Sequence, residues 1–263
     1  MRIALGIEYD GSGFFGWQRQ PEGRTVQACV EEALSVVADH PVEVVCAGRT
    51  DTGVHATGQV VHFDSEAARA MDGWRRGTNA HLPEDVRVQW AHPVDASFHA
   101  RFGATERHYR YIIHNHRVNS PLLRNRVCPI YAQLDVVSMQ TAASYLRGEH
   151  DFTSFRAVAC QAHSPVRTIS HLEVSASGDF IYLDVMANAF LHHMVRNIVG
   201  SLLAVGAGSK PSAWIAELME QHDRRLAAET APADGLYLVD VEYPAKFQLP
   251  ATPYGPIVAG ANR

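Results

Sequence analysis

The sequence predicts an α+β fold made of two ferredoxin-like (βαββαβ) units with mainly antiparallel sheets and a cleft between them. Three observations support this class. Apolar residues alternate with period two in several short segments, as in half-buried strands. Segments with apolar residues at helical spacing separate those strands. The order strand, helix, strand, strand, helix, strand occurs twice along the 263 residues, the second time with an added helix.

The first unit is expected to span residues 1–100. Ile3, Leu5 and Ile7 alternate with other residues in a strand that stops at a glycine-rich turn. Thr25 and Ser65 are suitable caps for the starts of two helices. The expected elements are strands at 2–9, 42–46, 58–63 and 86–91 and helices at 25–39 and 65–79.

The second unit is expected to span residues 101–263, with insertions and an extended tail at 249–256. Asp135 is a suitable cap for a helix, and Ser177-Gly178-Asp179 indicates a hairpin turn. The expected elements are strands at 106–114, 168–176, 180–186 and 236–242 and helices at 135–146, at 189–205 and after Pro211.

The composition is that of a globular protein, since 46% of residues are hydrophobic and 19% are charged. No run of about 18 apolar residues is present, so we expect no membrane span. The N-terminus does not resemble a secretory signal. The four cysteines lie far apart without a CxxC pattern, which argues against a zinc knuckle and favours a reduced, cytoplasmic location.

The net charge of −5 argues, by itself, against a nucleic-acid-binding protein. The distribution of charge points the other way. Residues 101–126 contain six arginines and one acid, so this segment carries +5 and the rest of the chain −10. Arginine suits phosphate and base edges, although genomic codon bias explains arginine richness equally well.

A loop of small residues, CAGRTDTGVHATGQV at 46–60, carries the side chains best suited to chemistry. Asp51 is its carboxylate, Arg49 precedes it by two positions, and His55 follows. Small residues let a ligand approach the backbone closely. An aspartate beside glycine is commonly a turn former, but the crowding of charged groups on this loop favours a functional role.

This loop resembles the active-site motif of the tRNA pseudouridine synthase A family. Four further blocks resemble that family in the same order, and the resemblance extends from about residue 3 to residue 256. The blocks are IEYDGSGFFGWQRQ at 7–20, FHARFGATERHYRYII at 98–113, GEHDFTSFRA at 148–157 and ANAFLHHMVRNIVGSL at 187–202. Thr52 replaces an alanine that is common in the family.

The resemblance implies an isomerase without a cofactor that converts uridine to pseudouridine at positions 38, 39 and 40 of the tRNA anticodon stem-loop. It implies that Asp51 is the catalytic nucleophile. A carboxylate is suited to attack either the sugar C1′ or the base C6, and the sequence does not choose between them. We expect a basic side chain to keep Asp51 ionised. The buried uridine must be flipped out of the stem, at a cost of roughly a few kcal/mol.

The resemblance also implies three substrate-binding residues. Arg49 matches a family arginine that holds the RNA where the flipped base leaves a gap. Arg196 matches an arginine that pairs with the catalytic aspartate, and its apolar neighbours favour a role over a surface charge. Tyr109 matches a tyrosine that stacks on the uracil, although Tyr111 lies on the same face of the expected strand.

Further arginines are candidates for phosphate contacts, because each neutralised phosphate releases counterions. These are Arg24, Arg101, Arg107, Arg110 and Arg156. A solvated surface charge is the alternative for each of them.

The fifteen histidines are interpreted as general composition, and no metal is expected. His192 and His193 are expected on a helix, where adjacent side chains point about 100° apart and cannot both bind one ion without distortion. The partners implied by the resemblance are tRNA and a second copy of the chain in a homodimer. A tRNA-binding protein without catalytic activity on the same fold is the alternative function; it would have no need for Asp51.

Overall fold

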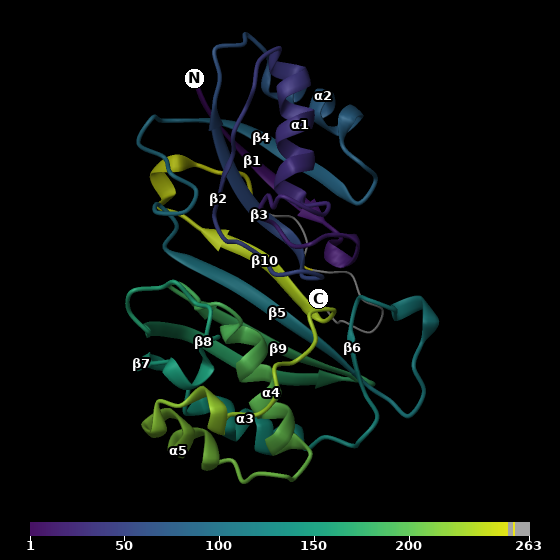
Figure 1. Cartoon of the computed structure of the whole chain (residues 1–263), viewed down its shortest axis with the longest axis vertical. Helices are drawn as coiled ribbons and strands as arrows, with labels where there is room; N and C mark the ends of the chain where they lie inside the picture. Colours follow the sequence, from purple (N-terminus) through teal and green to yellow (C-terminus); the bar gives the residue numbers. More distant parts are fainter. Residues whose placement is uncertain (252–254, 256–263) are drawn as a thin grey trace. The chain divides into compact units, whose positions relative to one another are not determined.

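The computed structural model describes residues 1–251 and 255 and divides them into two compact units (Figure 1). The first unit consists of Met1–Arg107 and the segment that begins at Tyr237; the second consists of His108–Leu236. The last strand, expected in the second unit, has residues 237–242 grouped with the first. Residues 252–254 and 256 of the expected tail lie outside the described part of the chain.

The first unit packs two helices against a mostly antiparallel sheet. Its strands lie in the order β4-β1-β3-β10, with β2 also paired to β3. β1 is antiparallel to both β3 and β4, whereas β10 is parallel to β3. The elements are β1 (Arg2–Tyr9), α1 (Val26–Ala38), β2 (Val45–Cys46), β3 (His55–Asp64), α2 (Met71–His81), β4 (Val86–Val94) and β10 (Leu236–Glu242).

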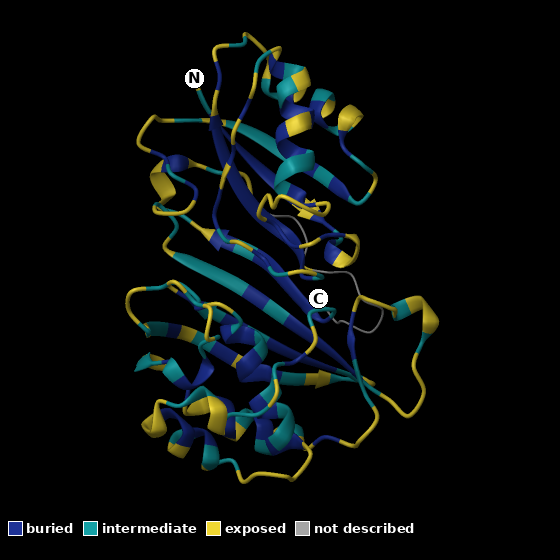
Figure 2. Ribbon diagram, in the orientation of Figure 1, coloured by how far each residue is buried: buried dark blue, intermediate teal, exposed yellow. Residues whose placement is uncertain are grey.

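The core of this unit lies on both faces of β3, and Figure 2 shows the strand as a dark band along its length. On one face, Phe63 packs against Trp74 of α2, with ring centroids 5.1 Å apart. On the other face, His62 packs against Phe98 at 5.9 Å, and Phe98 packs in turn against Phe247. Burial on both faces explains why β3 is almost wholly buried rather than alternating.

Two elements of this unit differ from the prediction for local reasons. The strand expected at 42–46 is reduced to Val45–Cys46, because the backbone N–H of Val44 donates to the Glu31 carboxylate at 3.0 Å instead of to a strand. The helix expected from Ser65 begins at Met71. The Ser65 hydroxyl instead accepts the backbone N–H of Ala67 at 3.1 Å, which forms a turn before the helix.

The second unit has its strands in the order β5-β9-β8-β7, with β6 parallel to β5. The long hairpin of β8 and β9 was predicted, and Gly178 at its turn has a φ of +57°. The short strands β6 and β7 were not predicted. The elements are β5 (Glu106–Asn115), β6 (Cys128–Ile130), α3 (Val136–Ser144), β7 (Gly148–Asp151), β8 (Val166–Ser177), β9 (Phe180–Ala187), α4 (Met194–Gly206) and α5 (Trp214–Gln221).

The predicted α+β class with mainly antiparallel strands is confirmed. Within the described residues, every helix falls short of the length and apolar character that a membrane crossing requires.

Candidate active site

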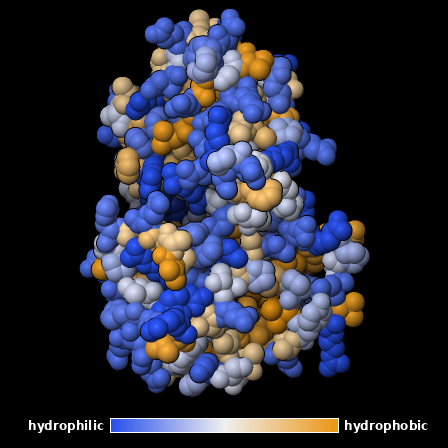
Figure 3. Space-filling view, in the orientation of Figure 1, coloured by the Kyte–Doolittle hydropathy of each residue, from blue (hydrophilic) through white to orange (hydrophobic). Residues whose placement is uncertain are grey.

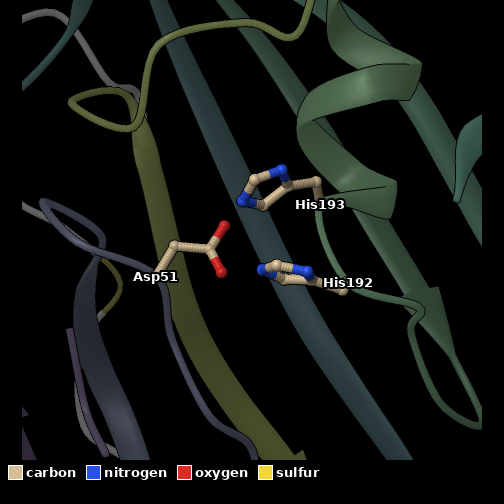
Figure 4. A group of neighbouring side chains, drawn as sticks. All are labelled: Asp51, His192 and His193. Carbon is tan, nitrogen blue, oxygen red and sulfur yellow. The ribbon is translucent and has the colours of Figure 1, made fainter. Parts of the chain in front are cut away.

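Asp51 lies half-buried on the loop of residues 47–54, which joins β2 to β3 (Figure 4). The base of this loop is held by Gln59, a fully buried side chain of β3. The Gln59 amide nitrogen donates to the carbonyl oxygen of Gly48 at 2.6 Å, and its amide oxygen accepts the N–H of Gly48 at 3.3 Å. The loop therefore leaves the sheet in a fixed direction.

The residue before Asp51 is held from two sides. The Thr50 hydroxyl lies 2.7 Å from the hydroxyl of Tyr9, at the end of β1. The Thr50 carbonyl oxygen accepts the backbone N–H of Trp17 at 3.0 Å. Tyr9 and Trp17 are themselves buried and pack together, with ring centroids 5.9 Å apart. These contacts fix the backbone that carries the carboxylate.

Two glycines allow other segments to approach the loop closely. Gly16 has a φ of +82°, and a Cβ at this position would lie 2.7 Å from the Thr50 carbonyl oxygen. A Cβ at Gly11 would lie 1.9 Å from the Val54 carbonyl oxygen. Both positions therefore require glycine, because any side chain would push the loop away from its supports.

His55 closes the loop at the first position of β3. Its ring is buried and stacks on Tyr237 of β10, with centroids 4.6 Å apart. Its Nδ1 accepts the backbone N–H of Gly11 at 3.1 Å and lies 3.2 Å from Oδ1 of Asp10. The geometry gives His55 a positioning role, a role that the sequence did not assign.

Positive charge gathers beside the base of the loop. Burial raises the pKa of the Cys46 thiol to about 12, and the nearby charges of Arg49, Arg101 and Arg107 oppose this rise. The thiol is therefore protonated and unreactive at neutral pH. Arg107 donates to the carbonyl oxygens of Ala47 and Ala104, at 3.2 Å each, and also to that of Arg101. It links the loop to the segment that follows β4.

The second unit contains the other two residues assigned to substrate binding. Tyr109 is buried in β5 with its ring edge-on to Phe190, at 5.0 Å and 82°. Tyr111 is fully buried, and its hydroxyl donates to the Pro232 carbonyl oxygen at 2.8 Å. Burial raises the pKa of Tyr111. The phenol of Tyr111 is therefore part of the fold.

Arg196 lies in the first turn of α4 and is half-buried. Its Nε donates to the Ala231 carbonyl oxygen at 2.8 Å, and its own carbonyl oxygen accepts the Ala231 N–H at 3.1 Å. The neighbouring residues Val195 and Ile198 are buried, as the sequence predicts. These bonds fix the backbone and Nε, so the guanidinium is held in a defined direction.

The helix expected from residue 189 begins at Met194, because His193 has a left-handed φ of 60°. His192 and His193 therefore precede α4 (Figure 4), and their ring centroids lie 4.0 Å apart. The two histidines do not lie on a helix, so the prediction that helical geometry points their side chains about 100° apart is wrong. The predicted absence of a metal loses that support and remains an expectation.

Four of the five arginines assigned to phosphate contacts have acceptors within the protein. Arg24 forms a two-pronged ion pair with Asp85 at 2.6 and 2.7 Å, and Arg110 does so with Asp184 at 2.8 and 3.0 Å. Arg156 donates to the carbonyl oxygens of residues 160 and 162, at 2.7 Å each. Arg107 has the three carbonyl partners given above. Their role in RNA binding stays a prediction.

Arg101 differs from the other four arginines. It is exposed, and its guanidinium carbon lies 5.4 Å from the centre of the Phe102 ring. This makes it the arginine of the set whose charge is best placed to meet a ligand.

Known proteins match this chain over nearly its whole length. Residues 6–103 and 142–244 match the family described as tRNA pseudouridine synthase. A protein from Vibrio cholerae named tRNA pseudouridine synthase A is 58% identical over 262 residues, which is 100% of this chain and 99% of that protein. Proteins of the same name from Actinobacillus pleuropneumoniae (56% over 262 residues, 100% of both chains) and Aeromonas hydrophila (58% over 257 residues, 98% and 96%) are also similar.

Proposed function

The chain belongs to the tRNA pseudouridine synthase family, and we propose that it acts on uridines 38, 39 and 40 of the anticodon stem-loop, with Asp51 as its nucleophile. It is an isomerase that forms pseudouridine in tRNA. The observation that carries the proposal is the position of Asp51: a half-buried carboxylate directly after Thr50, whose backbone and side chain are both held. Preorganisation of this kind is what a nucleophile requires.

The reaction breaks the N1–C1′ bond, turns the uracil and joins C5 to C1′. The proton on C5 is lost and N1 gains one, so that substrate and product are isomers. In one route, the Asp51 carboxylate traps the sugar at C1′ as the base leaves; in the other, it adds to C6 of the ring. Both routes need an ionised carboxylate and a uridine flipped out of the stem.

The remaining residues have supporting roles in this proposal. Arg49 is exposed on the same loop, two residues before Asp51, and is suited to hold the RNA backbone beside the flipped nucleotide. Tyr109 is suited to stack on the uracil, because it is the tyrosine of β5 that matches the family motif and its aromatic ring is held edge-on by Phe190. Arg196 is suited to bind an anionic group, since its Nε bond orients the guanidinium.

The test is replacement of Asp51 by Asn, assayed as pseudouridine formed at each of the three positions in an unmodified tRNA transcript. We expect the rate to fall by about a thousandfold or more, as on removal of a nucleophile in other enzymes, while tRNA affinity changes little. Product at the wild-type rate would instead favour the tRNA-binding alternative. Product only at other uridines would keep the chemistry and refute the anticodon assignment.

The homodimer, which the resemblance implies, and the cytoplasmic location, which the spacing of the cysteines indicates, remain expectations. Sedimentation of the purified protein at micromolar concentration would test the first, since a monomer under these conditions would contradict it.

A further inference from the structure

A tight turn at residues 99–103, after β4, presents an aromatic ring to solvent. Phe102 is 78% exposed. The turn is closed from within, because Nδ1 of His99 accepts the N–H groups of both Arg101 and Phe102, at 3.2 and 3.1 Å. Gly103 donates its N–H to the His99 carbonyl oxygen at 2.8 Å. The exposure of Phe102 is thus imposed by a closed turn.

The ring of Phe102 is anchored to the sheet through two histidines. The His99 ring lies 4.5 Å from it, and His62 of β3 lies 4.9 Å from His99. Nδ1 of His62 also accepts the N–H of Ala100 at 3.1 Å. Burial lowers the pKa of His62 to about 4, so this ring is neutral at physiological pH. Three neighbouring rings, tilted against one another, therefore extend from the core to the surface.

The exposed ring belongs to a positively charged neighbourhood. The Arg101 guanidinium lies over it, and Arg107 joins the Arg101 carbonyl oxygen to that of Ala47, at the base of the Asp51 loop. The charge of Arg49 acts on the same Cys46 thiol as the charges of Arg101 and Arg107. The turn and the loop that carries Asp51 are thus tied together within one unit.

The chemistry of this surface identifies its ligand. The face shown in Figure 3 is mostly hydrophilic, with separate apolar groups. The most exposed of the large apolar side chains among the described residues, Leu122 and Val158, are aliphatic, whereas Phe102 is the most exposed aromatic one. An aromatic face with guanidinium groups beside it is the arrangement that binds an unstacked nucleobase together with its phosphate.

We propose that Phe102 is a stacking platform for an unpaired nucleobase of the tRNA, and that Arg101 binds the phosphate of the nucleotide that stacks there. The choice of tRNA as ligand rests on the proposed function. Flipping a uridine leaves bases of the stem-loop without their stacking partners, and stacking on Phe102 would offset part of that cost.

The experiment compares Phe102→Ala and Phe102→Trp with the wild-type protein, using an unmodified tRNA transcript as the probe. We expect Phe102→Ala to weaken tRNA binding roughly tenfold and Phe102→Trp to retain it. In Phe102→Trp, the added fluorescence should be quenched on titration with tRNA, over the signal of the four native tryptophans. Tyr145→Ala removes another exposed aromatic ring, at the end of α3, and should bind as the wild type does. Arg101→Ala should lower the slope of log affinity against log salt by about one.

Unchanged affinity in Phe102→Ala would overturn the proposal. So would a loss of affinity without quenching in Phe102→Trp, or a loss that accompanies a change in sedimentation, which would place the ring in a contact between protein copies. The outcome is separable from that of Asp51→Asn. If tRNA quenches the fluorescence of Phe102→Trp but the wild-type protein forms no pseudouridine at the proposed uridines, the stacking proposal stands and the catalytic proposal is refuted. If Phe102→Ala has normal catalytic activity and unchanged tRNA affinity, the catalytic proposal stands and the stacking proposal is refuted.

Discussion

The loop of residues 47–54 and the turn of residues 99–103 lie in the same unit but are held in different ways. Distant parts of the chain hold the loop: Tyr9, Trp17 and Gln59 each bind its backbone or its threonine. The turn is closed by one of its own side chains, that of His99, and is also bonded to His62, Arg107 and Tyr243 outside it. A nucleophile needs a fixed position, so the loop is part of the core. A stacking surface needs exposure, which the closed turn provides.

The substitution Gly16→Ala is the strongest test of whether catalysis depends on the contacts that hold the loop. The new Cβ would meet the Thr50 carbonyl oxygen at 2.7 Å while the backbone is held at a φ of +82°. We expect a displaced loop and a fall in the rate of pseudouridine formation of about a hundredfold, since misplacement by about 1 Å has that effect in enzymes. Single-turnover assays and thermal unfolding measure the two effects.

Gly178→Ala is the matched control for Gly16→Ala. Gly178 also has a positive φ, of +57°, but a Cβ there would meet nothing within 4 Å. It should lose some stability through backbone strain and keep its activity. Equal losses of activity in the two variants would mean that close approach to the loop is unimportant.

Gln59→Leu is expected to have the next largest effect. It removes both hydrogen bonds between the Gln59 side-chain amide and the backbone of Gly48. The N–H and carbonyl groups of Gly48 then lack partners, which costs about 1–3 kcal/mol for a buried group. We expect the rate constant to fall about tenfold with little change in KM, because the loop loses its fixed base while the RNA contacts remain.

Gln140→Leu is a matched control in the second unit, where the Gln140 amide oxygen accepts the Val174 N–H at 2.6 Å. It should lose stability without a comparable loss of rate constant. If both variants lose rate in proportion to stability, Gln59 supports only the fold.

The difference between loop and turn also explains what the sequence could predict. Asp51 and Arg49 stand out because the loop around them has a composition of its own. The residues that hold the loop in place do not stand out in the sequence. Gln59 and Trp17 look like ordinary strand and loop residues, and their contacts with the loop form only in the folded chain. The partners of the charged residues could not be predicted either. Arg24 forms an ion pair with Asp85 and Arg110 with Asp184, and these partners lie 61 and 74 residues away in the sequence.

The predictions of some element boundaries were wrong for a related reason. The strand β1 was predicted at its observed bounds from local alternation alone. The shortening of β2 depends on the Glu31 side chain of α1, and the late start of α4 depends on the left-handed backbone at His193. Neither feature leaves a local signal, because the first depends on a tertiary contact and the second on a backbone conformation that residues other than glycine seldom adopt.

The smallest expected effect concerns the attachment of the turn to β3 through His62. Its pKa is about 4 in the folded protein, against an ordinary value of 6.5, because burial and then the nearby charges of Arg2 and His99 disfavour the imidazolium, with Asp64 opposing them. Between these two values the unfolded chain binds a proton that the folded chain does not. Stability should therefore fall as the pH drops from about 6.5 to about 4.

His62→Asn tests this expectation, because it removes the titrating group and leaves a side chain that can still accept the Ala100 N–H. Urea unfolding between pH 7 and pH 4 should give a shallower loss of stability for the variant, by an amount on the order of 1 kcal/mol at pH 4.5 after solvent screening is allowed for. Identical slopes would show that His62 is protonated without cost in the folded protein. The turn would then be less dependent on β3 than its contacts with His62 indicate.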